Sequence, residues 1–339
     1  RRAVNMKSDK ITIADVAEAL QVSKTTVSRA ISGKGRIGDA TRKRVLAYIE
    51  ANDYKPNVIA KGLAQKKTYN IALVLPGDCN LVDMPFFQNS MQGICEEASA
   101  HDYDVMLVPV TGSNLGNLER MIANSKVDGV ILSRSLVKDT RAALLQKENI
   151  PFVMMGTSRD AKILQVDNEH RAGCSALVSR MLHSGIARIG LIGGSRNYVV
   201  NRTRKQGYED AFCAEGKTPE TALMLEDCDS VAKIESAASK LIQAGAGAIV
   251  CMDDMICSVV LQVLADRDIL VPQQIQVASF YDSTLLRHAK PAVTSLLFDD
   301  RALGALTCKV LLHCIQGEEV KPKTLLGYEL AVRESTLFD

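Results

Sequence analysis

Apolar residues near the start of the chain recur at helical spacing. The apolar positions of this first run are Ile13, Val16, Ala17 and Leu20. Their i, i+3, i+4, i+7 pattern places them on one face of a helix. Thr12 precedes the run and Asp15 follows three residues later, which fits an N-cap with an acidic first turn. We therefore predict a short helix that begins after Thr12 and buries one face.

A second short helix is predicted directly after the first. The pattern breaks at residues 21–22, and Ser23 is placed to cap a helix that starts at Lys24. Val27 and Ile31 share one side of this helix. The outward side chains are then Lys24, Thr25, Ser28 and Arg29. Two short helices joined by a tight turn form a helix-turn-helix, which presents one face to a DNA groove. The alternative is a pair of amphipathic helices in an ordinary bundle.

A third helix is predicted from Asp39 to about Ala51. Its apolar positions are Val45, Leu46 and Ile49, and its other sides carry Arg and Lys. Three helices of this length can close a small core. The next residues lead away from it, because Pro56 restrains Lys55 from helical geometry. The run at 58–65 is too short to form a stable helix alone in water.

From Asn70 onward, short apolar segments alternate with helical stretches. The predicted strands are Ile71–Leu75, Val105–Val108, Gly129–Leu132, Phe152–Met155, Ile189–Ile192, Ala248–Cys251 and Gln276–Ser279. The predicted helices are Phe87–Ala100, Arg171–His183, Arg204–Glu215, Val231–Gln243 and Met255–Ala265. Strands that are apolar on both faces and separated by helices are typical of a buried parallel sheet. There are too many units for one sheet, so we expect an α/β fold with two similar doubly wound lobes.

Charge separates the two parts of the chain. Residues 1–68 contain 15 Lys and Arg against 6 Asp and Glu, a net charge of +9, and the remainder has a net charge of −7. A basic head on an acidic body is typical of a nucleic-acid-binding protein with a separate regulatory part. No apolar run is long enough to span a bilayer, and the N-terminus lacks the apolar region of a secretory signal. The nine scattered Cys residues fit reduced thiols in a cytoplasmic protein.

Residues 11–68 contain motifs that resemble a known family. They include VS-x-x-TVSR at 22–29 and YxPN-x-x-A-x-x-L at 54–63. The whole stretch resembles the DNA-binding headpiece of the lactose-repressor (LacI/GalR) family. The resemblance implies that the second helix lies in the major groove of double-stranded DNA, where Lys24, Thr25 and Arg29 read bases.

The same resemblance assigns residues 1–56 to the headpiece and residues 57–68 to a hinge. The hinge would become helical only on DNA, in a homodimer, and Leu63 would act as a wedge between base pairs in the minor groove. A marginal helix gains order from its partner and the groove, and an apolar wedge kinks the duplex. The residues expected to contact DNA are Thr12, Ser23, Lys24, Thr25, Thr26, Ser28, Arg29, Asn57, Ala60 and Leu63.

The rest of the chain resembles, more loosely, the effector-binding core of the same regulators. The matching segments are VDGVIL at 127–132, VDNEHRAG at 166–173, RIGLIGG at 188–194, RKQGYEDAF at 204–212 and VP-x-x-IQVASFYDS at 271–283. The resemblance implies a two-lobed, periplasmic-binding-protein-like (type I) core over residues 69–339. The N-lobe would span about 69–166 and 298–321, and the C-lobe about 167–291 and 324–339. Crossings between lobes are expected near Asp167, at 290–297 and at 321–324.

A small effector is expected between the lobes, because ligands of such sheets bind outside the carboxyl ends of strands. Arg204 and Asp282 occupy positions that bind the effector in the family. A guanidinium and a carboxylate suit the hydroxyls of a sugar or the edges of a purine. The alternative is that these two residues pair only to hold the cleft. Asp253 is a further polar candidate, with Asp254 as its rival.

Aromatic residues bear on the nature of the effector. The chain has no Trp and only 4% aromatic residues, so stacking on a sugar depends on Phe or Tyr. Phe86 and Phe87 could stack on a ring, although Phe87 fits a helix core equally well. Tyr281 is an extra bulky residue where the family has Gly-aromatic-Asp, and Tyr198 is placed to fill part of the pocket. The candidate effector-binding residues are Phe86, Phe87, Asn168, Arg196, Tyr198, Arg204, Asp253 and Asp282.

Other chemistry has little support in the sequence. The Gly pair at 193–194 lacks the GK[ST] end of a phosphate loop, and no Gly-x-Ser-x-Gly elbow is present. Cys251 with Cys257, and His313 with Cys314, lack the spacing of metal ligands, so neither a metal nor a cofactor is expected. A solute-binding protein would share the core, but it would need a signal peptide and would have no headpiece.

The sequence therefore predicts a cytoplasmic transcription regulator rather than an enzyme. We expect a repressor that binds a near-palindromic operator and responds to a carbohydrate effector. A regulator with a purine or another metabolite as corepressor is the alternative, with the opposite sign of response. No heptad tail follows the last predicted strand, which favours a dimer over a tetramer.

Overall fold

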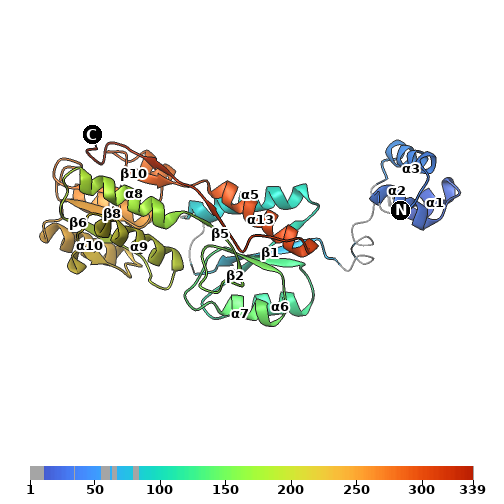
Figure 1. The fold of residues 1–339 in the computed structure, drawn as a ribbon, viewed down its shortest axis with the longest axis horizontal. Helices are drawn as coiled ribbons and strands as arrows, with labels where there is room; N and C mark the ends of the chain where they lie inside the picture. Colours follow the sequence, from blue (N-terminus) through green and yellow to red (C-terminus); the bar gives the residue numbers. More distant parts are fainter. Residues whose placement is uncertain (1–10, 34, 55–61, 63–66, 79–83, 339) are drawn as a thin grey trace, which may run out of the picture. The chain divides into compact units, whose positions relative to one another are not determined.

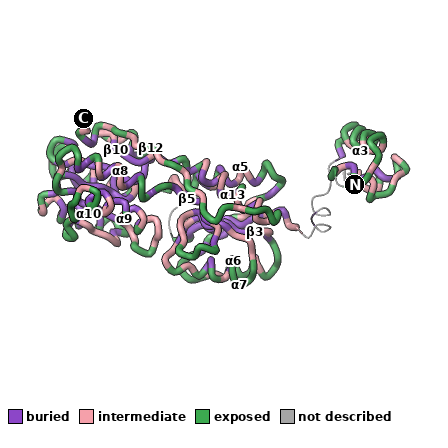
Figure 2. The backbone as a smooth tube through the Cα atoms, viewed as in Figure 1, coloured by how far each residue is buried: buried purple, intermediate pink, exposed green. Residues whose placement is uncertain are grey.

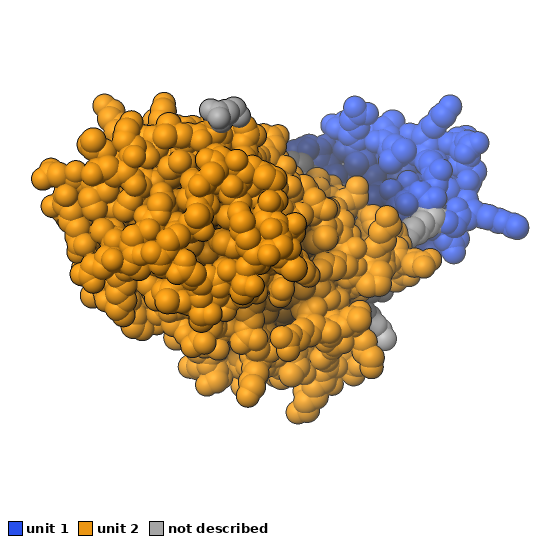
Figure 3. Space-filling view, turned by 60° about the vertical axis from the view of Figure 1, so that its left-hand side comes forward, with its two compact units in different colours: residues 1–68 blue, residues 69–339 orange. Residues whose placement is uncertain are grey.

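The computed structural model of the 339-residue chain describes residues 11–33, 35–54, 62, 67–78 and 84–338. The chain forms two compact units, residues 1–68 and residues 69–339 (Figure 3). The predicted hinge positions Asn57, Ala60 and Leu63 lie outside the described residues. None of the helices in the described part of the chain combines the length and apolarity that a bilayer crossing requires.

Between residues 11 and 54, the described part of the first unit contains three short helices (Figure 1). They are α1 (Ile13–Ala19), α2 (Lys24–Ser32) and α3 (Asp39–Ala51). Each helix contributes a fully buried valine to the core: Val16, Val27 and Val45. The three predicted helices are confirmed, but Leu46 is 44% exposed rather than buried. Because successive helical residues are turned by about 100°, a core face centred on Val45 directs Leu46 toward solvent.

A six-stranded parallel sheet lies at the centre of the first lobe of the second unit, in the order β11-β5-β4-β3-β1-β2. Its strands are β1 (Asn70–Pro76), β2 (Asp104–Val110), β3 (Gly129–Leu132), β4 (Phe152–Met155), β5 (Leu164–Asn168) and β11 (Lys323–Leu326). The helices are α5 (Pro85–Ala100), α6 (Gly116–Ala123), α7 (Thr140–Lys147) and α13 (Asp300–Gln316). Alternate strand residues pack against α5 and α13 on one face and against α6 and α7 on the other. The central strands are accordingly buried on both faces (Figure 2).

The second lobe contains a second six-stranded sheet in the order β12-β10-β9-β8-β6-β7. Its strands are β6 (Ile189–Ile192), β7 (Met224–Leu225), β8 (Ala248–Cys251), β9 (Gln276–Ser279), β10 (Thr294–Leu297) and β12 (Glu329–Ala331). Its helices are α8 (His170–His183), α9 (Val199–Ala214), α10 (Val231–Gln243), α11 (Asp254–Ala265) and α12 (Thr284–Arg287), and a 3-10 turn covers Thr221–Leu223. All pairs are parallel except β10 with β12.

The predicted α/β fold with two doubly wound lobes is confirmed, and the crossings define how the lobes connect. The chain crosses after β5, after β10 and between β11 and β12. The last two crossings lie later than predicted. The strand at 294–297 still belongs to the second sheet, and Lys323–Leu326 pairs with β5 in the first. Helix α9 also begins at Val199, five residues before the predicted start at Arg204.

Candidate DNA-binding face and ligand-binding cavity

Local hydrogen bonds fix the start of both helices of the helix-turn-helix. The Thr12 amide donates to Asp15 Oδ2 at 2.7 Å and the Asp15 amide donates to Thr12 Oγ1 at 3.4 Å, a reciprocal capping box. The Ser23 hydroxyl accepts from the Thr26 amide at 3.1 Å at the start of α2. These caps satisfy backbone amides that would otherwise lack partners, which explains why such short segments are helical.

Helix α2 presents a face rich in hydrogen-bond donors. Val27 and Ala30 are buried against the other two helices, whereas Lys24, Thr25, Ser28 and Arg29 are exposed, as predicted. The Thr26 hydroxyl, by contrast, is half-buried and shares a 2.8 Å hydrogen bond with Ser23 Oγ. Two cations and two hydroxyls on one exposed helical face match the acceptors of base edges and phosphates in a major groove.

In the second unit, Arg204 lies at the centre of a buried polar cluster. Its guanidinium donates to the Met252 carbonyl and stands 6.0 Å from the centre of the Tyr281 ring. Arg204 is only 7% exposed, and its Nε has no hydrogen-bond partner among the described residues. Burial raises the pKa of the Asp253 carboxyl, and the positive charge of Arg204 opposes that shift. The cluster thus holds a strong donor whose bonding capacity is incompletely used.

A hydrogen bond across the lobes completes this cluster. Tyr281, which follows β9, donates its hydroxyl proton to Asp300 Oδ2 at 2.6 Å, and Asp300 begins α13 of the first lobe. Burial raises the pKa of the Asp300 carboxyl to about 6, although the hydrogen bond from Tyr281 lowers it. Tyr281, the extra bulky residue of the sequence, therefore faces the other lobe and bonds to it.

The raised pKa of Asp300 predicts a pH-dependent cost to stability. The carboxyl ionises near pH 3.8 when unfolded and near pH 6 when folded, so its stabilising contribution is lost as pH rises through that window. Relative to wild type, Asp300→Asn should gain up to about 3 kcal/mol of unfolding free energy between pH 4 and pH 7. Urea unfolding of both proteins at several pH values measures this difference. His170 titrates in both proteins, so its contribution cancels from the difference in unfolding free energy. A difference that does not change with pH would contradict the expectation.

Several predicted effector residues are engaged elsewhere. Asp282 accepts from Arg333 Nη1 at 2.8 Å and Nη2 at 3.1 Å, so its partner is Arg333 and not Arg204. Arg196 is exposed and bonds to Asp227. Phe87 is buried in the core of the first lobe, and both phenylalanines belong to α5 rather than to a loop.

Two other predicted residues, Phe86 and Tyr198, do lie between the lobes, and Asp253 begins a helix of the second lobe. Phe86 packs against the hydrophobic cores of both lobes. Tyr198 of the second lobe lies under the guanidinium of Arg134 of the first lobe, 4.2 Å from the ring centre, and Tyr198 also forms a bridge with Leu136. Asp253 caps α11 by accepting from the Ile256 amide at 2.8 Å. These residues position the lobes or their helices.

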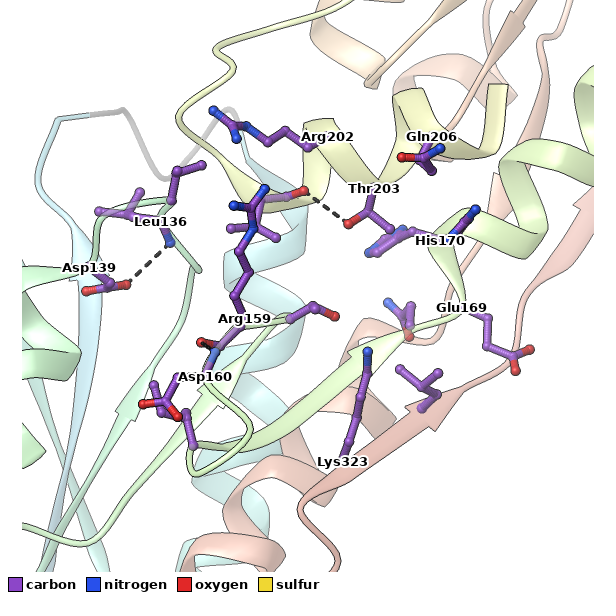
Figure 4. Close-up of a pocket in the computed structure, with 18 of the residues that line it drawn as sticks. Leu136, Asp139, Arg159, Asp160, Glu169, His170, Arg202, Thr203, Gln206 and Lys323 are labelled. Atoms are coloured by element: carbon purple, nitrogen blue, oxygen red, sulfur yellow. Dashed lines mark hydrogen bonds between the residues drawn. The ribbon is translucent and has the colours of Figure 1, made fainter. Parts of the chain in front are cut away.

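A cavity of about 950 Å³ opens between the lobes (Figure 4). Its walls come from α7, the segment after β4, the end of β5, the start of α8, α9 and β11. The side chains labelled in Figure 4 are Leu136, Asp139, Arg159, Asp160, Glu169, His170, Arg202, Thr203, Gln206 and Lys323. Of the eight candidate effector residues, Asn168 alone lines it.

The inner wall of the cavity contains polar atoms without partners. Asn168 is 3% exposed, and both its side-chain oxygen and nitrogen lack a hydrogen-bond partner among the described residues. His170 Nδ1 also lacks one, while Nε2 lies 3.5 Å from Asp167 Oδ1. Burial, then the charge of Arg204, lowers the pKa of His170 well below its usual value, so the ring is neutral at pH 7. Buried unpaired polar groups of this kind are costly and are typical of a site that a ligand completes.

The fold and these two sites define a class of protein. A helix-turn-helix unit with an exposed cationic helix face precedes a two-lobed α/β unit with a cavity between its lobes. This combination is that of a DNA-binding regulator whose second unit has the fold of a periplasmic binding protein.

Comparison with known proteins supports the same class. Residues 12–57 match the bacterial regulatory proteins of the lacI family, and residues 178–336 match the periplasmic binding protein-like domain. The HTH-type transcriptional regulator pepR1 of Lactobacillus delbrueckii subsp. lactis is 25% identical over 342 residues, 98% of this chain and 99% of that protein. MalR of Streptococcus pneumoniae is 36% identical over 208 residues, 60% of this chain and 62% of that protein.

Two solved structures extend the comparison. The structure of a transcriptional regulator CelR–cellobiose complex aligns with a TM-score of 0.73 and 27% identity, over 96% of this chain and all of that one. The structure of the lac repressor dimer bound to operator and an anti-inducer aligns with a TM-score of 0.77 and 23% identity, over 97% of this chain and all of that one. At this identity the alignment shows that the two proteins share a fold. The chain thus combines a lacI-family DNA-binding domain with a periplasmic-binding-protein-like domain, and the relatives that it matches over nearly its whole length are transcription regulators rather than enzymes.

Proposed function

We propose that this chain is a homodimeric repressor whose affinity for operator DNA is set by a small molecule bound between the lobes. The observation that carries the proposal is the cavity lined by both lobes, with the unpaired Asn168 amide in its wall. A ligand that touches both lobes favours one lobe arrangement over another. It can shift DNA affinity only through that preference.

The relatives favour a carbohydrate as the effector. One solved relative is a complex with cellobiose, and another is described as a probable maltose operon transcriptional repressor. The hydrogen-bonding groups of the cavity, an amide, an imidazole and hydroxyls, suit a polyol. Arg204, Asp253, Phe86 and Tyr198 remain proposed effector residues, although they do not line this cavity. A purine or another metabolite acting as corepressor is the second candidate.

A homodimer is proposed because the second lobe exposes apolar side chains on neighbouring helices. Met255 on α11 and Leu285 on α12 are 43% and 55% exposed, and these two helices pack together. Two copies of the headpiece related by a twofold axis would read a near-palindromic operator. Such a regulator works in the cytoplasm, where the chromosome lies.

Selection of operator sequences followed by a ligand screen tests the proposal. The full chain would be used to select duplexes from a random pool, and sugars, sugar phosphates and purines would then be screened for changes in operator affinity. We expect a near-palindromic sequence and at least one compound that changes its affinity. A sequence with no twofold symmetry, or no response to any compound that binds the protein, would contradict the proposal.

Replacing Arg29 tests the DNA-binding face itself. Arg29→Ala should weaken operator binding by roughly 1–3 kcal/mol and flatten the preference at one base position, because a bidentate contact to a base edge is lost. Lys43→Ala, an exposed cation on α3, is the matched control and should lower affinity for all sequences alike. Binding curves against operator variants measure both effects, and an unchanged base preference in Arg29→Ala would remove Arg29 from sequence readout.

A further inference from the structure

Two cations point into the cavity between the lobes. Figure 4 shows Arg159, from the segment after β4, extending toward the start of α9, and Lys323, on β11, extending toward Thr203 and His170 of the other lobe. Both residues are exposed, and neither side chain forms a hydrogen bond or ion pair with another described residue. Arg and Lys side chains without partners, held on one side of a cavity, are donors available to a ligand.

The acidic residues that line the cavity do not neutralise these two cations. Asp139 is held by Arg141, whose Nε donates to it at 2.9 Å, and Asp160 accepts from the Gln146 amide at 2.8 Å and the Lys162 backbone at 2.9 Å. Asp210 is paired with Arg171. The Asp139, Asp160 and Glu169 carboxylates point away from the interior in Figure 4. The interior is therefore positive on the side of the first lobe.

The rest of the cavity wall, from the end of β5 and from the second lobe, is neutral and polar. The unpaired side-chain atoms of Asn168 offer two donors and an acceptor, and His170 Nδ1 adds another unpaired position. The Thr203 hydroxyl donates to the Val199 carbonyl at 3.1 Å, which leaves its oxygen free to accept. Hydroxyl groups both donate and accept, so they match this wall, whereas a second anionic group would not.

We propose that the effector is an anionic polyol, with a phosphate or carboxylate held by Arg159 and Lys323 and hydroxyls bonded to Asn168 and His170. This inference rests on the proposed function, because it assigns a chemical class to the molecule bound between the lobes. Arg159 and Lys323 belong to the first lobe, and His170 and Thr203 to the second. A ligand with an anion at one end and hydroxyls at the other links the lobes and fixes their separation.

Matched ligand pairs on the full chain test the assignment. Calorimetric titration would compare glucose with glucose 6-phosphate and with gluconate, and inorganic phosphate alone would probe the cation pair. The anionic member should bind at least tenfold more tightly than the neutral one, because charge-assisted hydrogen bonds to Arg and Lys are stronger than neutral ones. Comparing the affinities of glucose 6-phosphate and gluconate shows whether the site prefers a phosphate or a carboxylate.

Single substitutions test which side chains bind the anionic group of the ligand. Arg159→Gln and Lys323→Gln should each weaken binding of the anionic ligand about tenfold and leave binding of the neutral ligand unchanged. Arg202→Gln is the matched control, because Arg202 also lines the cavity but points away from its interior (Figure 4) and should change neither. Unchanged operator affinity without ligand would show that the variants are folded and still bind DNA.

The outcomes separate this inference from the proposed function. If neutral sugars bind as tightly as their anionic partners and the two Gln variants bind unchanged, the anion assignment is wrong while an effector between the lobes remains supported. If Asn168→Ala loses neutral and anionic binding together while the Gln variants lose only the anionic ligand, the assignment is supported. If neither an anionic ligand nor inorganic phosphate binds wild-type protein saturably, the assignment is overturned.

Discussion

Arg333→Ala is expected to lower the free energy of unfolding by about 3–5 kcal/mol, because it leaves a buried carboxylate without its ion-pair partner. The Asp282 side chain is completely buried and receives both ends of the Arg333 guanidinium, with a further 2.6 Å hydrogen bond from Ser295 Oγ. Arg287 remains at 3.4 Å, but its own side chain is 50% exposed, so it compensates poorly. Urea unfolding measures the loss.

Two further proteins show whether charge is the cause. Asp282→Asn added to Arg333→Ala should recover part of the lost stability, because the uncompensated charge is removed. Lys233→Ala breaks the surface pair of Lys233 with Asp229, where both side chains are 57% exposed, and should cost far less than Arg333→Ala. If Arg333→Ala costs no more than Lys233→Ala, the Asp282 ion pair does not hold the second lobe together, and Asp282 would again be open to an effector role.

Gly304→Ala should destabilise the first lobe by about 3 kcal/mol, the upper part of the usual range for overpacking. Helices α5 and α13 approach so closely that a Cβ at Gly304 would overlap the Ser90 carbonyl oxygen, and one at Gly93 would overlap that of Arg301. A clash with backbone requires the helices to separate. Thermal unfolding of the full chain measures the effect.

Gly327→Ala is the control for the glycine replacement. Gly327 lies in the same unit, its φ is not in the left-handed region, and a Cβ there would have nothing within 4 Å. Alanine at this position should be neutral or slightly stabilising, since it restricts the unfolded chain. Equal stability of the Gly304 and Gly327 variants would show that α5 and α13 can move apart without cost.

The sequence predicted best what depends on neighbouring residues. The capping box of Thr12 and Asp15, the Ser23 cap and the exposed face of α2 follow from spacings of three or four residues, and all are present in the structure. The buried strands of the parallel sheets were also predictable, because their apolar residues stand in short runs between helices. Helix α13 was missed, and so were the short strands at the crossings between lobes.

Which residues line the site depends on strand pairs between distant parts of the chain, and the spacing of residues along the sequence does not reveal these pairs. Asp282 was expected in the cleft, but its partner Arg333 is 51 residues away and comes to it through the antiparallel pairing of β12 with β10. Lys323 reaches the cavity because β11 pairs with β5. In that pair Lys323 lies opposite Gln165, which is 158 residues earlier in the chain. Asn168 ends β5 and His170 follows it two residues later, so a strand predicted there would have placed both residues at the ligand-binding edge of the sheet.

Reciprocal coupling between the ligand and the operator tests the central claim most directly. Operator affinity of the full chain would be measured with and without a saturating cavity ligand at one salt concentration, and ligand affinity with and without operator. If the ligand acts through the lobe arrangement, both affinities change by the same factor, typically about 5–150-fold. A ligand that fills the cavity, as shown by its loss in Asn168→Ala, and leaves operator affinity unchanged would contradict the account.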